Sequence, residues 1–241
     1  MEQKNIVLLH GFGENASIWQ GYQKLLSIDY NVICPEYSQR NDFKSILEYA
    51  DFVKQTLDLA GVKKCIVIGH SMGGYITMAF AEKYPEMLIG IGLFHTTVFG
   101  DTDERKIVRQ KNIERLKQFG TEAFVESFVP NLYAPSFQIA HPDVIAAHKE
   151  LASKISADAL IAAQKAMISN PDRRDVLKKI QCRVLFIIGE LDKNISPADA
   201  KSQIMIPKYF SSSILDNVAH MGMVEEADHC LAFIRKFIAG C

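Results

Sequence analysis

The sequence predicts an α/β fold with a mostly parallel central sheet of about six strands, flanked by helices, and with a helical lid inserted in the chain. Short β-branched runs alternate with stretches of helical length, which is typical of a parallel sheet covered by helices. The central runs are almost continuously apolar, as in strands that are buried on both faces. No strand-like run occurs between about residues 98 and 180. We therefore expect a core formed by residues 1–97 and 181–241, and a lid formed by residues 98–180.

The expected strands end in residues that favour loops over hairpins. We expect strands at residues 5–10, 31–34, 64–69, 88–94, 183–189 and 212–215. The core helices are expected at residues 17–26, 43–60, 73–84 and 225–238. Several of the strands end in Gly, His or Ser, which predicts loops at the carboxyl edge of the sheet, where open α/β sheets bind ligands.

Punctuating residues divide the lid into helices. Thr102, Thr121 and Ser156 are the residue types that cap helix N-termini. Pro142 suits a first helical turn, and Gly120 suits a helix end. The lid is therefore expected to contain several helices joined by turns.

The composition excludes some classes of protein. At 241 residues, the chain is long enough for one α/β domain with an inserted subdomain. Its net charge of −1 leaves no basic surface for nucleic acid or an anionic membrane. No apolar run approaches the roughly 18 residues that cross a bilayer, and the strand-like pattern from residue 5 onward leads us to expect no signal peptide. Five irregularly spaced cysteines without a C-x-x-C pair indicate reduced thiols and a cytoplasmic location.

One motif carries more chemical information than any other in the chain. Gly69-His70-Ser71-Met72-Gly73-Gly74 directly follows an apolar strand-like run and matches the G-x-S-x-G pattern of a nucleophile elbow. The turn is so sharp that positions 69 and 73 must lack bulky side chains, and it exposes the Ser71 hydroxyl. Because a serine hydroxyl is a poor nucleophile at neutral pH, a base and an acid are required elsewhere in the chain.

The base is expected to be His220. It lies in a loop that follows the last predicted strand, which is where a catalytic histidine is needed. The remaining histidines stand in less suitable positions: His10, His70, His95, His141, His148 and His229.

The acid is expected to be Asp192, which follows the strand at residues 183–189. The resulting order of Ser, Asp and His along the chain is that of one class of serine hydrolase. Glu190 competes for the role because it is two residues away. Asp101 and Asp103 offer another position for the acid after an earlier strand.

Backbone N–H groups are expected to form an oxyanion hole. Met72 follows the nucleophile and opens the elbow helix, so its N–H is one donor. The N–H of Phe12, in the glycine-containing loop after the first strand, is the expected second donor.

The same loop also matches a nucleotide-binding pattern. Residues 11–16 fit G-x-G-x-x-A, and Glu36 falls near the end of the second strand, as in a dinucleotide-binding fingerprint. The following helix is expected to begin near Ser17, which is too late for that fingerprint. A nucleotide site also leaves the elbow unexplained. No G-K-[ST] follows a glycine-rich turn, which excludes a P-loop.

Together, His10-Gly11-Phe12-Gly13, the elbow, Gly189-x-x-Asp192 and Ala219-His220-Met221 resemble the α/β-hydrolase superfamily, in its branch of small, lidded serine esterases. Members of this family usually have a short hairpin before the first strand; we expect none here, and therefore about six strands instead of eight. The serine nucleophile argues against the dehalogenase and epoxide hydrolase branches, which use aspartate. The resemblance implies acyl transfer through an acyl-enzyme, on a small-molecule substrate, without a metal or an organic cofactor.

The substrate is less well defined than the chemistry. Candidate pocket residues share aromatic, thioether or imidazole side chains near the core–lid boundary, and they are Trp19, His95, Phe99, Phe128, Tyr133 and Met167. Aromatic side chains at helical spacing more often belong to a core. Arg105, Arg109 and Arg115 recur on one lid helix and either meet a substrate carboxylate or form a solvated face.

These observations favour an esterase that acts on a small apolar ester. A lactone hydrolase, a carbon–carbon bond hydrolase and a slow-turnover ligand receptor on the same fold are the alternatives. The sequence leaves the oligomeric state open.

Overall fold

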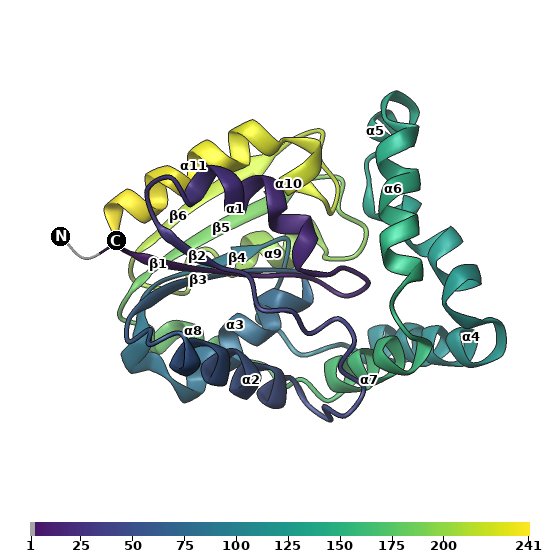
Figure 1. Ribbon diagram of the computed structural model, residues 1–241, viewed down its shortest axis with the longest axis horizontal. Coiled ribbons are helices and arrows are strands. Elements are labelled where there is room, and N and C mark those ends of the chain that lie inside the picture. Colours follow the sequence, from purple (N-terminus) through teal and green to yellow (C-terminus); the bar gives the residue numbers. More distant parts are fainter. Residues whose placement is uncertain (1–2) are drawn as a thin grey trace.

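The computed structural model describes residues 3–241 and contains a six-stranded, all-parallel sheet (Figure 1). The strand order is β2-β1-β3-β4-β5-β6. The strands are β1 (Asn5–Leu9), β2 (Asn31–Ile33), β3 (Cys65–His70), β4 (Leu88–Phe94), β5 (Arg183–Gly189) and β6 (Phe210–Leu215). The predicted fold class is confirmed. β3 runs one residue further than expected, and β6 begins two residues earlier.

The strand order reverses between β1 and β3. β1 pairs with β2 on one side and with β3 on the other, so the chain leaves the centre of the sheet and then returns past its starting point. Leu9 is in register with Gly69, which brings the loop after β1 beside the turn after β3. Open α/β sheets bind ligands at such a reversal, outside the carboxyl ends of the strands.

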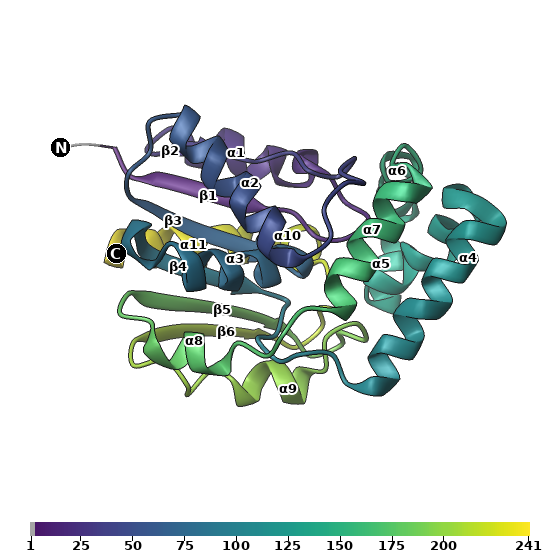
Figure 2. The ribbon, with the colours of Figure 1, turned by 90° about the horizontal axis from the view of Figure 1, so that it is seen from below.

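Helices cover both faces of the sheet, as Figures 1 and 2 show. One face carries α1 (Gln20–Leu26), α10 (Gly222–Glu225) and α11 (Ala227–Gly240). The other carries α2 (Ile46–Leu59), α3 (Met72–Lys83), α8 (Arg174–Lys179) and α9 (Pro197–Ser202). Short 3₁₀ turns occur at η1 (Ala16–Trp19) and η2 (Pro85–Met87). All six residues of β3 are buried, because helices lie on both of its faces.

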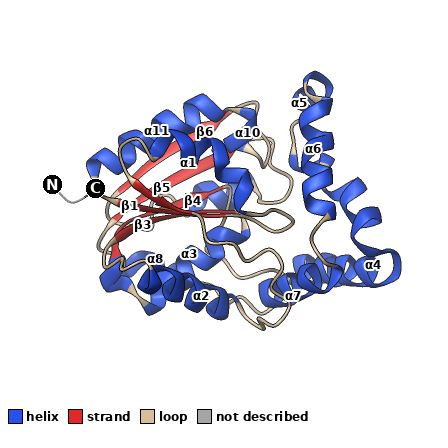
Figure 3. Ribbon diagram, in the orientation of Figure 1, coloured by secondary structure: helices blue, strands red, loops and turns tan. Residues whose placement is uncertain are grey.

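A helical insertion separates β4 from β5. It contains α4 (Asp103–Phe128), η3 (Pro130–Leu132), α5 (Pro135–Ala140), α6 (Pro142–Ser153) and α7 (Ala157–Ile168), and it leads into α8. Helices α4 to α7 lie beyond the carboxyl ends of the strands, and this part of the molecule shows only helix and loop in Figure 3. No helix within residues 3–241 is long and apolar enough to cross a membrane.

Two of the three expected N-caps in the insertion are confirmed. The side chains of Thr102 and Ser156 accept hydrogen bonds from backbone N–H groups in the first turns of α4 and α7. Thr121 does not cap a helix; its hydroxyl donates instead to the carbonyl oxygen of Ile155, 2.9 Å away. The helical path of α4 breaks at Gly120, whose φ of 74° lies in the left-handed region.

Candidate active site

Ser71 occupies a strained turn between β3 and α3. Its φ of 51° and ψ of −116° are rare for a residue with a side chain, and such strain is concentrated at functional sites. A Cβ atom on Gly69 would lie 2.0 Å from the carbonyl oxygen of Gly73. One on Gly73 would lie 2.5 Å from the carbonyl oxygen of Leu9. The two flanking glycines therefore allow the turn to close against the end of β1.

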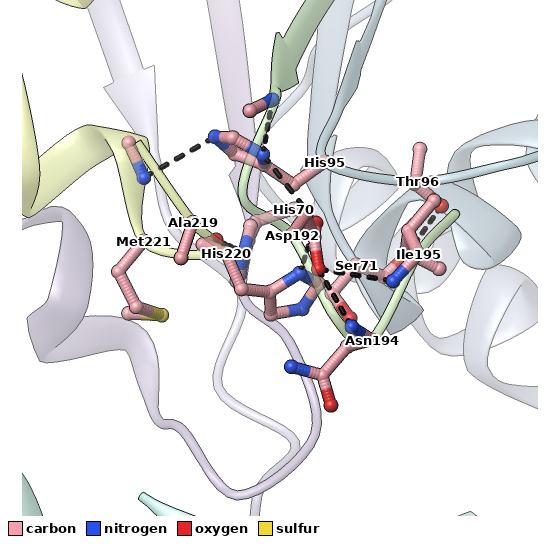
Figure 4. Close-up of polar contacts among 12 residues, drawn as sticks. His70, Ser71, His95, Thr96, Asp192, Asn194, Ile195, Ala219, His220 and Met221 are labelled. Carbon is pink, nitrogen blue, oxygen red and sulfur yellow. Dashed lines mark hydrogen bonds and ion pairs between the residues drawn. The ribbon is translucent and has the colours of Figure 1, made fainter. Parts of the chain in front are cut away.

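Asp192 and His220 form a buried hydrogen bond at the ends of β5 and β6 (Figure 4). Asp192 Oδ2 lies 2.7 Å from His220 Nδ1. Asp192 Oδ1 accepts hydrogen bonds from the N–H groups of Asn194 and Ile195, at 2.8 and 3.0 Å, which fixes the carboxylate. Burial by itself raises the pKa of Asp192, but the imidazoles of His220 and His95 outweigh it, so the pKa lies well below its usual range. The carboxylate is therefore charged and oriented toward the His220 ring.

Ser71 and His220 line the same cavity, which has a volume of about 230 Å³. The arrangement brings the sequence-predicted nucleophile and base to one place from positions 149 residues apart. Within residues 3–241, no hydrogen bond joins Ser71 Oγ to His220 Nε2. Catalytic hydrogen bonds of this kind commonly tighten only when substrate binds.

The competing acids lie elsewhere. Glu190 forms an ion pair with Lys201. Asp101 pairs with two arginines on α4, and the exposed Asp103 lies 3.2 Å from Lys106. None of these carboxylates contacts His220, so Asp192 is the acid that the structure brings to the imidazole.

The two N–H groups expected to form the oxyanion hole are free to bind a ligand. Neither Phe12 N–H nor Met72 N–H has an acceptor within residues 3–241. Met72 is the first residue of α3, where N–H groups have no partner inside the helix. Phe12 lines the cavity that contains Ser71. Two unoccupied donors at this place suit the negative charge of a tetrahedral intermediate.

A buried ion pair between Glu14 and His70 lies beside the candidate catalytic residues, and it was not predicted from the sequence. Glu14 Oε1 lies 2.9 Å from His70 Nδ1, and both side chains are almost completely buried. Burial raises the pKa of Glu14, but His70 more than offsets this and lowers it to about 2. Burial lowers the pKa of His70, and Glu14 more than offsets that, so it is raised above its usual value. Glu14 is therefore a carboxylate at neutral pH, and its charge favours the protonated form of His70.

The His70 ring has a second partner. Its Nε2 donates to the carbonyl oxygen of His220, 2.8 Å away. Glu14 Oε2 also accepts from the N–H of Gly11 at 2.6 Å. The ion pair therefore joins the loops after β1, β3 and β6. The position of His70 beside the nucleophile is the one sequence signal that pointed to it.

Four of the expected pocket residues lie outside the catalytic cavity. His95 lies behind Asp192, with Nδ1 3.6 Å from Oδ2, and burial lowers its pKa to about 4. Trp19 is fully buried against Tyr22 and Phe94 in the core. Composition and spacing do not distinguish such core residues from a pocket wall.

The other two corrections concern residues in or near the insertion. Phe99 packs against the apolar cluster beneath β4 and β5, with the Arg174 guanidinium over its ring. Tyr133 lines a separate cavity and its hydroxyl lies 2.8 Å from His148 Nδ1. Neither side chain lines the cavity that contains Ser71.

The cavity has walls from the core and from the insertion. Phe128 and Met167 line it, as expected. Residues that were not expected to line it are Tyr75, Val108, Asn112, Leu132, Gln164, Lys193, Asn194 and Ile195. Tyr75 is four residues after the nucleophile, on the same face of α3, which is a signal that sequence reasoning left unused. Arg105 and Arg109 also line the cavity, whereas the exposed Arg115 donates to the Ala123 carbonyl oxygen.

Curated proteins match this chain over a part or nearly all of its length. A 2-hydroxy-6-oxononadienedioate/2-hydroxy-6-oxononatrienedioate hydrolase of Pseudomonas putida is 26% identical over 259 residues, which cover 98% of this chain and 87% of that protein. An uncharacterized Mycobacterium tuberculosis protein is 30% identical over 90 residues, but the match spans only 34% of this chain and 26% of that protein.

Among solved structures, a thermophilic esterase from Thermogutta terrifontis, with malate bound, superposes with a TM-score of 0.92 at 24% identity. The match covers 98% of this chain and 90% of the esterase, and at this identity it establishes the fold. The model of the alpha/beta hydrolase family matches residues 6–233. The chain is therefore a member of the α/β-hydrolase family.

Proposed function

We propose that the protein hydrolyses a carboxylic ester of a small molecule, with Ser71 as nucleophile, His220 as base and Asp192 as acid. The observation that carries the proposal is the 2.7 Å hydrogen bond between Asp192 and His220, beside a cavity that the strained Ser71 also lines. An imidazole held in one tautomer beside a serine is the arrangement that activates a hydroxyl for acyl transfer.

The reaction follows from the positions of these groups. His220 Nε2 accepts the Ser71 proton as Oγ attacks the ester carbonyl carbon, and the oxyanion binds the N–H groups of Phe12 and Met72. The tetrahedral intermediate expels the alcohol, which takes its proton from His220, and leaves an acyl-enzyme. Water then attacks the acyl carbon, gives its proton to His220, and the acid leaves as Ser71 recovers the proton. Asp192 stabilises the imidazolium in both halves of the cycle.

The helical insertion acts as a lid in this proposal. Helices α4 and α7 contribute part of the cavity wall, and the core contributes the reacting groups. A wall from a separate helical segment shields the acyl-enzyme from bulk water and sets the shape of the acceptable substrate.

All five cysteines are unpaired, which supports a reducing, cytoplasmic location.

A second candidate is cleavage of a carbon–carbon bond or a lactone by the same groups. The similarity to the Pseudomonas putida hydrolase over nearly the whole chain favours it. A receptor role with very slow turnover is the third reading, since the fold and the three side chains do not by themselves fix the rate.

Hydrolysis of 4-nitrophenyl esters from acetate to octanoate tests the proposal. We expect turnover that depends on acyl length and that falls to the uncatalysed level in Ser71→Ala. Ser136→Ala is the matched control, because Ser136 is an exposed serine on α5. Equal rates in the native protein and in Ser71→Ala would overturn the proposal, and assays of lactone and carbon–carbon cleavage would follow.

A further inference from the structure

The cavity that contains Ser71 is lined by positively charged side chains and, among the described residues, by no carboxylate. Three cationic side chains line it, namely Arg105 and Arg109 from α4 and Lys193 from the loop after β5. No Asp or Glu of the part of the chain that the structure describes lines it. Three positive charges disfavour the binding of a wholly apolar ester, because each charge has to be partly desolvated when such a substrate binds.

One acid outside the cavity compensates part of this charge. The Asp101 side chain is 3% exposed and forms ion pairs with both arginines. Arg105 Nε lies 3.2 Å and Arg109 Nη2 lies 3.3 Å from Asp101 Oδ1. A single carboxylate therefore serves two guanidinium groups. Of the other buried carboxylates, Asp192 is paired with His220 and Glu14 with His70.

Arg109 has a donor without a strong acceptor. Its Nε and Nη2 bind Asp101, while Nη1 reaches Gln164 Oε1 at 3.4 Å and Met167 Sδ at 3.2 Å, and the Tyr75 hydroxyl also lies close to the guanidinium. The first contact is long for a hydrogen bond, and a thioether sulfur is a weak acceptor. With 11% of the side chain exposed, water compensates little of this deficit. A carboxylate is the acceptor that suits a guanidinium N–H best.

The other two cations differ in their freedom. Arg105 Nη1 donates to the Asn194 carbonyl oxygen at 2.6 Å, which ties α4 to the loop that carries Asp192. Lys193 is exposed and has no ion pair within residues 3–241. Arg105 therefore holds the wall together, whereas Arg109 and Lys193 have donors that a ligand can use.

We propose that the substrate of this site carries a carboxylate remote from the bond that is cleaved, bound by Arg109 Nη1 and attracted by Lys193. The proposal rests on the proposed hydrolase activity of Ser71 and names its substrate class. It replaces the expectation of an apolar ester: Phe12, Phe128 and Leu132 accommodate an apolar spacer, and the cations take the charged end.

A matched pair of substrates tests the proposal. Mono-4-nitrophenyl adipate and 4-nitrophenyl heptanoate share a leaving group and have acyl chains of similar size, but only the adipate carries a carboxylate. We expect kcat/KM to be about tenfold higher for the adipate, mainly through KM, because a charge-assisted hydrogen bond contributes at least this factor. The preference should weaken as NaCl is raised, since screening acts on the adipate alone.

Variants locate the effect. Arg109→Gln should bring the ratio of the two kcat/KM values close to one, and Lys193→Gln should lower it partly. Arg115→Gln is the control, because Arg115 is on the same helix but outside the cavity, and the ratio should not change. Lys193 is exposed, so its substitution tests the proposal even where Arg109→Gln fails to fold. A ratio near one in the native protein, or one unchanged in both variants, would overturn the proposal.

Binding separates this proposal from the proposed activity. Monomethyl adipate and dimethyl adipate are titrated calorimetrically into Ser71→Ala, which needs no turnover. Tighter binding of the monoester, lost when Arg109→Gln is added and weakened when Lys193→Gln is added, supports the carboxylate site even where neither nitrophenyl ester is cleaved. Equal binding of the two adipates by Ser71→Ala contradicts it, whatever the esterase assay shows.

Discussion

His70 Nε2 donates to the backbone carbonyl oxygen of His220 across 2.8 Å, so the residue before the nucleophile holds the loop that carries the base. His70 is itself held by Glu14. The geometry between Ser71 and His220 therefore depends on a buried ion pair that takes no part in bond cleavage. Four predictions follow from this support and from the site above it.

Asp192→Asn should lower kcat by about 10⁴-fold, as a matched change does in other serine hydrolases with this arrangement. The amide NH₂ of asparagine can face His220 Nδ1 only if that nitrogen accepts, which places the ring proton on Nε2 and blocks it as a base. Nitrophenyl ester hydrolysis measures the loss. His229→Ala is the control, since His229 is exposed on α11 and its ring bonds only Ser213. A loss of less than tenfold in Asp192→Asn would count against Asp192 as the acid.

Glu14→Gln should lower the free energy of unfolding by about 1–3 kcal/mol at pH 7, because it replaces the charged acceptor of the His70 Nδ1–H and Gly11 N–H groups with a neutral amide. Urea denaturation followed by circular dichroism measures the change. The exposed Glu122→Gln on α4 should alter stability by less than about 0.5 kcal/mol. Equal stability of the two variants would show that the Glu14–His70 pair contributes nothing.

The lowered pKa of Glu14 also predicts how the free energy of unfolding depends on pH. The pKa of Glu14 is lowered from 4.5 to about 2 by folding, so the unfolded chain takes up this proton first as pH falls. Its contribution to stability is complete above about pH 4.5 and is lost progressively toward pH 2. Unfolding measured between these pH values should show a shallower decline in Glu14→Gln than in the native protein. Parallel curves would contradict the assignment.

Gly69→Ala should prevent the elbow from forming, because the added methyl group would lie 2.0 Å from the backbone oxygen of Gly73. We expect loss of activity together with a large drop in the melting temperature. Gly21→Ala is the matched control, since a Cβ atom at that position in α1 has nothing within 4 Å. It should raise stability by about 0.5–1 kcal/mol, because alanine loses less backbone entropy in a helix. A melting temperature of Gly69→Ala equal to that of Gly21→Ala would refute the steric argument.

Several parts of the site were predictable because they follow strand ends. Ser71, Asp192 and His220 each come shortly after a predicted strand, and parallel strands that share a sheet open at the same edge. Glycines around Ser71 are required by a turn that is local in sequence. The four inner strands, β1, β3, β4 and β5, were predictable from their apolar runs, because a strand that is buried on both faces needs apolar side chains on both.

Other features depended on how distant segments pack. Trp19 and Phe128 have equal claims to a pocket in the sequence, and only the placement of α4 against the core decides that Phe128 lines it and Trp19 does not. The Glu14–His70 pair joins positions 56 residues apart, and no periodicity connects them.

The sequence by itself determined the sheet, the elbow and the order of the candidate catalytic residues, because strand burial and tight turns are set by neighbouring residues. The tertiary structure alone decided which arginines of α4 reach the cavity: Arg105 and Arg109 line it, and Arg115 is exposed. The three arginines carry the same charge and lie on the same helix. Their difference comes from the packing of the helical insertion against the sheet edge, which brings one part of α4 over Ser71 and leaves another in solvent.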